Sequence, residues 1–281
     1  MVSVNLGLVH YVLDHIYGTV LHRTKLGTPF FSKGWGGTRL VLLERMVKQL
    51  FPEAPSQNWP PTAVQPIWKT VWETKNSSLR EGVFRTTCDE RLIDALPPES
   101  HNARVAFLTP KSVSPEKMAC VVHLAGGVHA AMVGSLHPTP IATLPFLAPH
   151  SAVVPFCEGL YRHATAWDAL MEDAAALAQD ATSLTEDAAQ KSGITIEQVK
   201  DRLRSVLSLT DVTRFPVPKK PQAVIFVGAT DDGYIPRHSV MQLQKAWPGS
   251  EVRWVTGGHV SSFLLHNDSF RKAIVDGLDR L

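Results

Sequence analysis

The stretch that decides the fold is Ala223-Val-Ile-Phe-Val-Gly-Ala-Thr-Asp-Asp-Gly-Tyr-Ile-Pro236, near the carboxyl end of the chain. It begins as a short apolar run, which is typical of a buried strand, and the run stops at two aspartates and a glycine. One strand further on, Trp254-Val-Thr-Gly-Gly-His259 has the same form and ends in a histidine. Ligands bind at the carboxyl ends of strands in open α/β sheets. The pattern therefore predicts a site at Asp232 and His259.

These two residues follow the chain order of a Ser-Asp-His catalytic triad, with the acid after the penultimate strand and the histidine after the last one. In such a triad the acid fixes the imidazole tautomer, and the imidazole takes the proton of the serine. Asp231 is the neighbouring alternative for the acid. A structural alternative stays open for both residues: Asp232 would cap the helix that begins near Arg237, and His259 would be a buried histidine satisfied by backbone groups.

The serine that would complete the triad is missing from its expected pattern, because Gly-x-Ser-x-Gly occurs nowhere in the 281 residues. Ser135 and Ser151 lie near the ends of predicted elements, but neither has the flanking glycines that allow a nucleophile to sit on a strained turn. Cys120 falls within a predicted strand, and Cys157 precedes a helical insertion. The sequence therefore leaves open whether the chain is an enzyme.

The fold class follows from the order of the predicted elements. Strands alternate with helices in the second half, so we expect an α/β fold with a mostly parallel sheet and helices on both faces. Apolar runs in the first half predict strands with an antiparallel edge. The expected elements outside the quoted stretch are strands at 67–74, 79–87, 104–108, 118–124 and 141–147, and helices at 128–136 and 268–281.

We expect a single domain over residues 1–281 with two helical additions. The first is an N-terminal extension over residues 1–60, with a helix in Met1 to Lys25 and another over Thr38 to Phe51. The apolar residues of the first helix recur at helical spacing, which favours a helix docked on the core by that face. They are Leu6, Val9, Val12, Leu13 and Ile16.

The second addition is a helical lid over residues 160–213. Its central part, Trp167 to Leu207, is rich in Ala, Asp, Glu and Gln. It also contains two N-cap signatures, Ser183-x-x-Glu186 and Thr195-x-x-Gln198, which mark helix starts.

Composition narrows the classes of function. The chain is 44% hydrophobic and 19% charged with a net charge of +2, which is typical of a globular protein and gives no support to nucleic-acid binding. No apolar run reaches the ~20 residues of a transmembrane helix. The three cysteines, Cys88, Cys120 and Cys157, lack zinc spacing, which favours reduced thiols and an intracellular location, cytoplasmic or organellar. The histidines are scattered, so neither a metal nor another cofactor is expected.

Five stretches carry a family resemblance: Phe30-Phe-Ser-Lys-Gly-Trp-Gly36, Val122-His-Leu-Ala-Gly126, Asp232-Gly-Tyr-Ile-Pro-Arg237, Ala246-Trp-Pro-Gly249 and Gly257-Gly-His-Val260. Together they resemble the α/β-hydrolase domain-containing protein 18 family. The resemblance implies an α/β-hydrolase fold, hydrolysis of an ester or lipid acyl group, and a small-molecule partner of that kind; it identifies no protein partner. It also implies the acid role for Asp232, the base role for His259, and the start of the oxyanion loop at Gly126.

One region departs from the family pattern. Gly126 is followed at once by Gly127-Val-His-Ala-Ala-Met132, which resembles the glycine and helix after a nucleophile elbow. Roughly 80 to 100 residues would be missing, at ~30 or more residues for each strand-plus-helix unit. Leu124 stands where the serine would be. We therefore expect a shortened form whose sheet lacks central strands; the alternative function is a non-catalytic splice form or pseudoenzyme that binds a partner.

Overall fold

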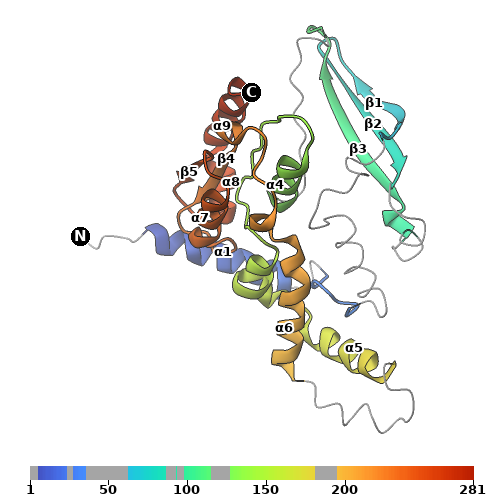
Figure 1. Cartoon of the computed structure of the whole chain (residues 1–281), viewed down its shortest axis with the longest axis vertical. Helices are drawn as coiled ribbons and strands as arrows, with labels where there is room; N and C mark the ends of the chain where they lie inside the picture. The colour runs from blue at the N-terminus through green and yellow to red at the C-terminus, as the bar shows by residue number, and fades with distance from the viewer. Residues whose placement is uncertain are drawn as a thin grey trace. The chain divides into compact units, whose positions relative to one another are not determined.

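The structure is a computed structural model that describes residues 6–23, 28–35, 63–86, 93, 98–114, 127–180 and 195–281. The chain falls into two compact units, one formed by Met1–Thr38 with His123–Leu281 and the other by Arg39–Val122. Figure 1 shows the elements of both units. The single-domain organisation expected for residues 1–281 stays a prediction.

The unit Arg39–Val122 contains a three-stranded antiparallel sheet in the order β1-β2-β3 (Figure 1). Its strands are β1 (Ile67–Glu73), β2 (Ser77–Arg85) and β3 (Asn102–Pro110). The backbone N–H groups of Asn76 and Ser77 donate to the Thr74 hydroxyl, which tightens the turn between β1 and β2. The strands expected at 67–74, 79–87 and 104–108 are confirmed, and they form a separate antiparallel sheet. The strand expected at 118–124 lies outside the described residues.

The other unit is built on two parallel strands, β4 (Ile225–Ala229) and β5 (Glu251–Val255). Their register runs from Ile225 beside Glu251 to Ala229 beside Val255, so both strands end at the same edge. All residues of β4 are buried. This burial matches the continuous apolar run of a parallel strand that is covered on both faces.

The segment at 141–147 lies beside β4 but is not a strand, which corrects the prediction. Thr143 and Phe146 each form an isolated parallel bridge, with Val224 and Val227 respectively. Pro145 has no N–H to donate to a ladder. Leu147 has a φ of 48°, in the left-handed region, so the extended backbone ends there. The apolar spacing of 141–147 does not reveal these two interruptions, and for that reason it predicted a strand.

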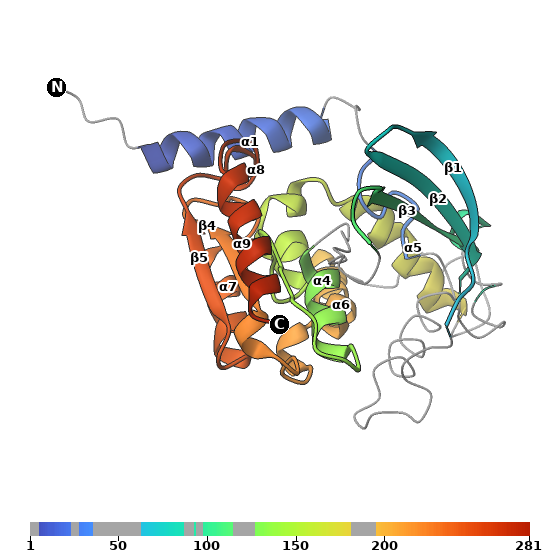
Figure 2. The same cartoon turned by 90° about the horizontal axis from the view of Figure 1, so that it is seen from above.

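Helices cover both faces of this parallel sheet (Figure 2). Phe226 points to the face covered by α4 (Gly127–Leu136) and α7 (Arg237–Ala246), where it packs with a cluster that includes Ala131 and Leu243. Ile225 and Val227 point to the opposite face and pack with Phe270 of α9 (Asn267–Asp279). The expected α/β class, with helices on both faces of a parallel sheet, is confirmed, as are the helices at 128–136 and 268–281.

The expected lid segment contains α5 (Trp167–Asp180) and α6 (Ile196–Leu207). Thr195 forms the predicted capping box with Gln198 at the start of α6, where each side chain bonds the backbone N–H of the other residue. The Ser183 signature lies outside the described residues. The two helices contact each other, and the role of the segment as a lid stays a prediction. Short 3-10 or π turns lie at Pro98–Ser100, Val154–Glu158, Leu160–His163, Ser208–Thr210, Val212–Arg214 and Pro221–Ala223.

The N-terminal helix α1 (Leu6–Arg23) forms as expected and packs against α8 (His259–Leu265), as Figure 2 shows. Its apolar face does not dock on the core, however. Leu13 and Ile16 are 49% and 54% exposed, whereas Asp14 is fully buried. The buried contacts of the helix with its unit are made by Asp14, which accepts backbone N–H groups, and by Gly18, which lies against Tyr234. The helix expected over Thr38 to Phe51 lies outside the described residues.

Candidate active site

Asp232 lies in the turn that follows β4, and its carboxylate is held by the backbone of that same turn. Its Oδ1 accepts the N–H groups of Tyr234 and Ile235, both at 2.8 Å. The side chain is 1% exposed. The helix α7 begins after Pro236 and has no side-chain cap, so Asp232 does not serve as its N-cap. These bonds fix the orientation of the carboxylate and leave Oδ2 for a further donor.

That donor is His259, the first residue of α8. Its Nδ1 lies 2.8 Å from Oδ2 of Asp232. A carboxylate can only accept, so Nδ1 carries a proton and donates it to Asp232. In the neutral ring Nε2 then has a lone pair, and no hydrogen bond from the described residues reaches it. The turn after β4 and the start of α8 thus bring together the two residues predicted from the sequence.

The neighbouring acid, Asp231, has different partners. Its Oδ2 accepts the hydroxyl of Thr230 at 2.6 Å. Its backbone N–H donates to the carbonyl of Gly257 at 2.9 Å, which ties the turn after β4 to the turn after β5. Within the described part of the chain no hydrogen bond joins Asp231 to His259. Asp232 is therefore the acid whose geometry suits the histidine.

The backbone before His259 turns sharply at two glycines. Gly257 has a φ of +129°, which L side chains rarely adopt. A Cβ on Gly258 would lie 2.6 Å from Oδ2 of Asp14, so the second glycine permits a close approach by α1. The two glycines let β5 end and α8 begin within a short distance of Asp232.

Three influences act on the pKa of His259. Burial lowers it, whereas the hydrogen bond to Asp232 and the negative charges of Asp232 and Asp14 raise it, and the net direction is upward. The side chain is still 29% exposed, so one edge of the ring contacts solvent. The ring of Tyr234 lies 5.1 Å from the imidazole, centroid to centroid, and burial raises the pKa of its hydroxyl. The tyrosine is therefore neutral beside a histidine that readily carries charge.

Asp14 is a site residue that the sequence reasoning missed. From α1 it accepts backbone N–H groups of Gly233 at 3.1 Å, His259 at 2.7 Å and Val260 at 3.2 Å. The only signal in the sequence is that Asp14 is the single acid of residues 1–25, in a helix with many apolar residues. A buried charge must find hydrogen-bond partners, but helical periodicity does not reveal that they lie more than 200 residues away.

Neither Ser135 nor Ser151, the two serines considered as replacement nucleophiles, forms a hydrogen bond with His259. The hydroxyl of Ser135 donates to the carbonyl of Pro216 at 2.5 Å, and that of Ser151 to the carbonyl of Leu207 at 3.3 Å. Burial raises the pKa of the half-buried Cys157 thiol, which disfavours the reactive thiolate. Cys120 and the expected oxyanion residue Gly126 lie outside the described residues.

Gly127, the first residue of α4, is described. A Cβ added there would lie 2.2 Å from the Cβ of Ala148. The helix therefore begins in close contact with the segment beside β4, and a side chain at this position would push the two apart.

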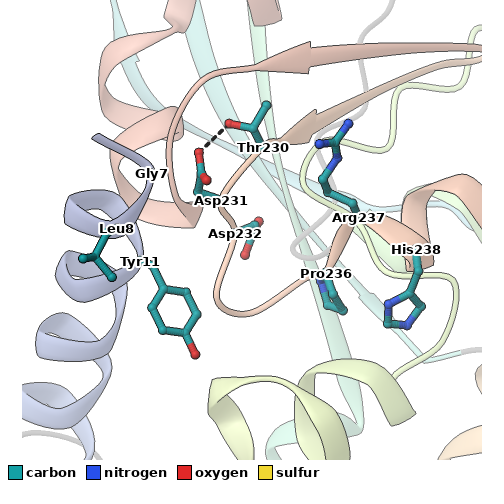
Figure 3. A pocket seen from close by; sticks show the side chains of 9 residues that line it. All are labelled: Gly7, Leu8, Tyr11, Thr230, Asp231, Asp232, Pro236, Arg237 and His238. Carbon is teal, nitrogen blue, oxygen red and sulfur yellow. Dashed lines mark hydrogen bonds between the residues drawn. The ribbon is translucent and has the colours of Figure 1, made fainter. Parts of the chain in front are cut away.

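A shallow pocket of about 570 Å³ opens beside the Asp232 turn. Figure 3 shows Tyr11 extending from α1 towards this turn, while Asp231 faces Thr230. His259 does not line the pocket, so the pocket adjoins the acid and not the exposed edge of the imidazole. Its lining residues are Gly7, Leu8, Tyr11, Thr230, Asp231, Asp232, Pro236, Arg237 and His238.

The part of the chain that the structure describes contains neither a metal site nor a membrane-spanning helix. No group of three or more His, Cys, Asp or Glu side chains there is arranged to hold a metal ion. Of the helices in the same part, none is both long enough and apolar enough to cross a bilayer.

Comparisons with known proteins found a matching family and a similar solved structure. The model of the family described as alpha/beta hydrolase domain containing 18 matches residues 28–127 and 125–280, two stretches that meet at residues 125–127. A crystal structure of a hydrolase from Pseudomonas aeruginosa PA01 is similar over 75% of this chain and 98% of that one, with 10% identity and a TM-score of 0.30; a likeness this low carries no argument. The family match spans most of the chain, which therefore belongs to the alpha/beta hydrolase domain containing 18 family.

Proposed function

We propose that this chain carries the acid and the base of an acyl-ester hydrolysis site, Asp232 and His259, and lacks the serine nucleophile. The 2.8 Å hydrogen bond between His259 Nδ1 and Asp232 Oδ2 carries the proposal. In an acyl-transfer site the base must present one ring nitrogen to the nucleophile while the other is held by the acid. Because Nδ1–H donates to Asp232, the acid holds that ring nitrogen, and Nε2 remains to face a nucleophile.

The absence of the nucleophile is supported by three observations. The sequence has no Gly-x-Ser-x-Gly. The family match breaks into two stretches at residues 125–127, and this break supports the inference of a missing segment. Ser135 and Ser151 donate their hydroxyls to backbone carbonyls away from His259. We infer that a segment carrying the elbow, together with central strands of the sheet, is missing at this junction.

The chemistry left to the dyad is limited. His259 could take a proton from water, and Asp232 would stabilise the resulting imidazolium. Removing the nucleophile from a Ser-His-Asp triad lowers kcat by about 10⁶. The substrate class would be an ester or lipid acyl group, but turnover by this chain should be negligible.

A fluorophosphonate probe tests the missing nucleophile directly, because it reacts covalently with an activated serine. We expect no labelling of the purified protein and no burst of product from a short-chain activated ester. His259→Asn serves as the matched control, since any dyad-dependent signal should disappear in it. Labelling at one serine that His259→Asn abolishes would refute the proposal and identify the nucleophile.

The dyad itself has a test that needs no turnover. With histidine labelled with ¹⁵N, the Nδ1–H of His259 should give a downfield proton resonance because it donates to a buried carboxylate. We expect that signal to be lost in both Asp232→Asn and His259→Asn. Its absence from the unmodified protein would mean that the two side chains are not paired in solution.

A second candidate function is a non-catalytic binding protein, produced as a shortened splice form or as a pseudoenzyme. Beside the dyad, α8 exposes three consecutive apolar side chains, Phe263, Leu264 and Leu265, and such clusters favour contact with a partner. A longer transcript of the same gene that inserts a nucleophile elbow at codons 125–127 would support the splice form. If the gene encodes only this form, the splice form would be refuted and the pseudoenzyme would remain as the second candidate.

A further inference from the structure

Asp14 stands out among the residues around the dyad because it is a fully buried carboxylate whose bonds reach two separate loops. Its Oδ2 accepts the N–H of Gly233, directly after Asp232, and the N–H of His259 itself. Its Oδ1 accepts the N–H of Val260. One side chain on α1 thus joins the turn of the acid to the helix of the base.

We propose that Asp14 is a positioning residue for the dyad, holding the backbones of Asp232 and His259 at the separation that their hydrogen bond needs. The inference rests on the proposed function, since the dyad is what Asp14 positions. Asp14 touches neither the side-chain carboxylate of Asp232 nor the exposed edge of the imidazole in any contact that the structure gives. It acts through backbone amides.

The start of α8 explains why an outside acceptor is needed. The first N–H groups of a helix have no acceptor within it, and a side chain at the N-cap normally supplies one. The N-cap here is Gly258, which has no side chain. The carboxylate of Asp14 accepts from His259 and Val260 in its place, and a negative charge also suits a helix N-terminus.

One face of α1 carries the residues that make this contact with the turn after β4 and with α8. His10, Asp14 and Gly18 are four residues apart, so they lie one above another. His10 Nδ1 lies 3.1 Å from the hydroxyl of Ser261, and a Cβ on Gly18 would lie 2.9 Å from the hydroxyl of Tyr234. The close approach at Gly18, with that at Gly258, brings the carboxylate within reach of the amides.

The same arrangement places a second negative charge beside the imidazole. The titratable groups that face His259 are Asp232 from the turn after β4, Asp14 from α1 and the hydroxyl of Tyr234, which burial keeps neutral. Removing the charge of Asp14 should therefore lower the pKa of His259. A residue that only held α1 in place would not act on the imidazole in this way.

The test is an NMR titration of the His259 ring in the full chain. Asp14→Asn keeps the size of the side chain and removes its charge, and Thr19→Ala, the matched control, changes an exposed position of the same helix without altering a charge. We expect Asp14→Asn to lower the pKa of His259 and to weaken its Nδ1–H signal, and Thr19→Ala to leave both unchanged. A folded Asp14→Asn protein with an unchanged pKa and signal would overturn the proposal.

Hydrogen exchange in the unmodified protein decides the case in which Asp14→Asn fails to fold. The amides of His259 and Val260 lie in the first turn of a short helix and should exchange quickly unless an outside acceptor protects them. We expect protection at these amides and at Gly233, and fast exchange there would refute the role of Asp14. Fluorophosphonate labelling would instead refute the missing nucleophile and leave these amide and pKa results intact, so the two failures are distinguishable.

Discussion

Two helices at opposite ends of the chain, α1 and α9, show similar apolar spacing but are held in different ways. In α9 the buried residues are apolar or small, Phe270, Ala273 and Gly277, and Phe270 packs on the parallel sheet. Among residues 7–20 of α1, whose burial the structure describes, the buried ones are Asp14 and Gly18, and apolar residues such as Leu13 and Ile16 are exposed. Both helices nevertheless lie against the part of the fold that carries the dyad.

Different forces attach the two helices. Burial of a phenylalanine side chain contributes about 1.5–3 kcal/mol without regard to direction, so α9 can be placed by the hydrophobic effect alone. The carboxylate of Asp14 instead requires donors at defined positions, and bonds to a charged acceptor contribute about 1.5–3 kcal/mol each before desolvation is counted. Hydrophobic burial therefore places α9, and hydrogen-bond geometry places α1.

The largest effect should come from the hydrophobic side of this comparison. Phe270→Ala removes a buried ring that packs on Phe146 at 4.9 Å between centroids. We expect a loss of about 3–5 kcal/mol in the free energy of unfolding, measured by urea denaturation. Val275→Ala, on the exposed side of the same helix, is the control and should change little. A loss below about 1 kcal/mol would mean that α9 is not held by its core contacts.

A smaller loss should follow from Asp14→Ala. The backbone N–H groups of Gly233, His259 and Val260 would lose their acceptor, and we expect a loss of about 2 kcal/mol together with faster proteolysis within α1. Thr19→Ala, at an exposed position of α1, should stay within about 0.5 kcal/mol. Equal stability of Asp14→Ala and the unmodified protein would contradict attachment by the carboxylate.

The pH dependence of stability separates two histidines. The pKa of His259 is raised in the folded state, so its contribution is fully present below its unfolded pKa and is lost as the pH rises through the folded pKa. Burial lowers the pKa of His150, so its contribution has the opposite sign and is lost as the pH falls below the unfolded value.

Melting temperatures between pH 5 and pH 8, a range chosen to span the ordinary pKa of histidine, check both signs. The difference between the unmodified protein and His259→Gln should shrink as the pH rises, and the difference for His150→Gln should grow. If both differences in melting temperature changed with pH in the same direction, the charges around His259 would not outweigh the effect of burial on its pKa.

The smallest effect on stability is expected on the exposed face of α1. Leu13→Ser and Ile16→Ser remove apolar side chains that are already in solvent, so the free energy of unfolding should change by no more than about 0.5 kcal/mol. Binding of a dye that fluoresces on apolar surfaces should fall in both variants. A loss of several kcal/mol would indicate that this face is covered in solution.

Much of the site could be predicted from local patterns. A short apolar run that stops at Asp-Asp-Gly, and another that stops at Gly-Gly-His, predict strands with polar groups at their carboxyl ends, and parallel pairing brings those ends together. The structure joins Asp232 and His259 as that reasoning requires. The same reasoning failed at 141–147, where Pro145 and the left-handed backbone of Leu147 limit the pairing to isolated bridges.

The residues alone predict the α/β class, the order of strands and helices after residue 223, and the acid and histidine at their strand ends, and they show the lack of Gly-x-Ser-x-Gly. These depend on residue types and on spacings of a few positions. The three-dimensional arrangement was needed to find that α1 docks through Asp14 and leaves its apolar face in solvent. Periodicity shows which residues of a helix share a side, but the side that is buried depends on the donors that the rest of the chain brings to it.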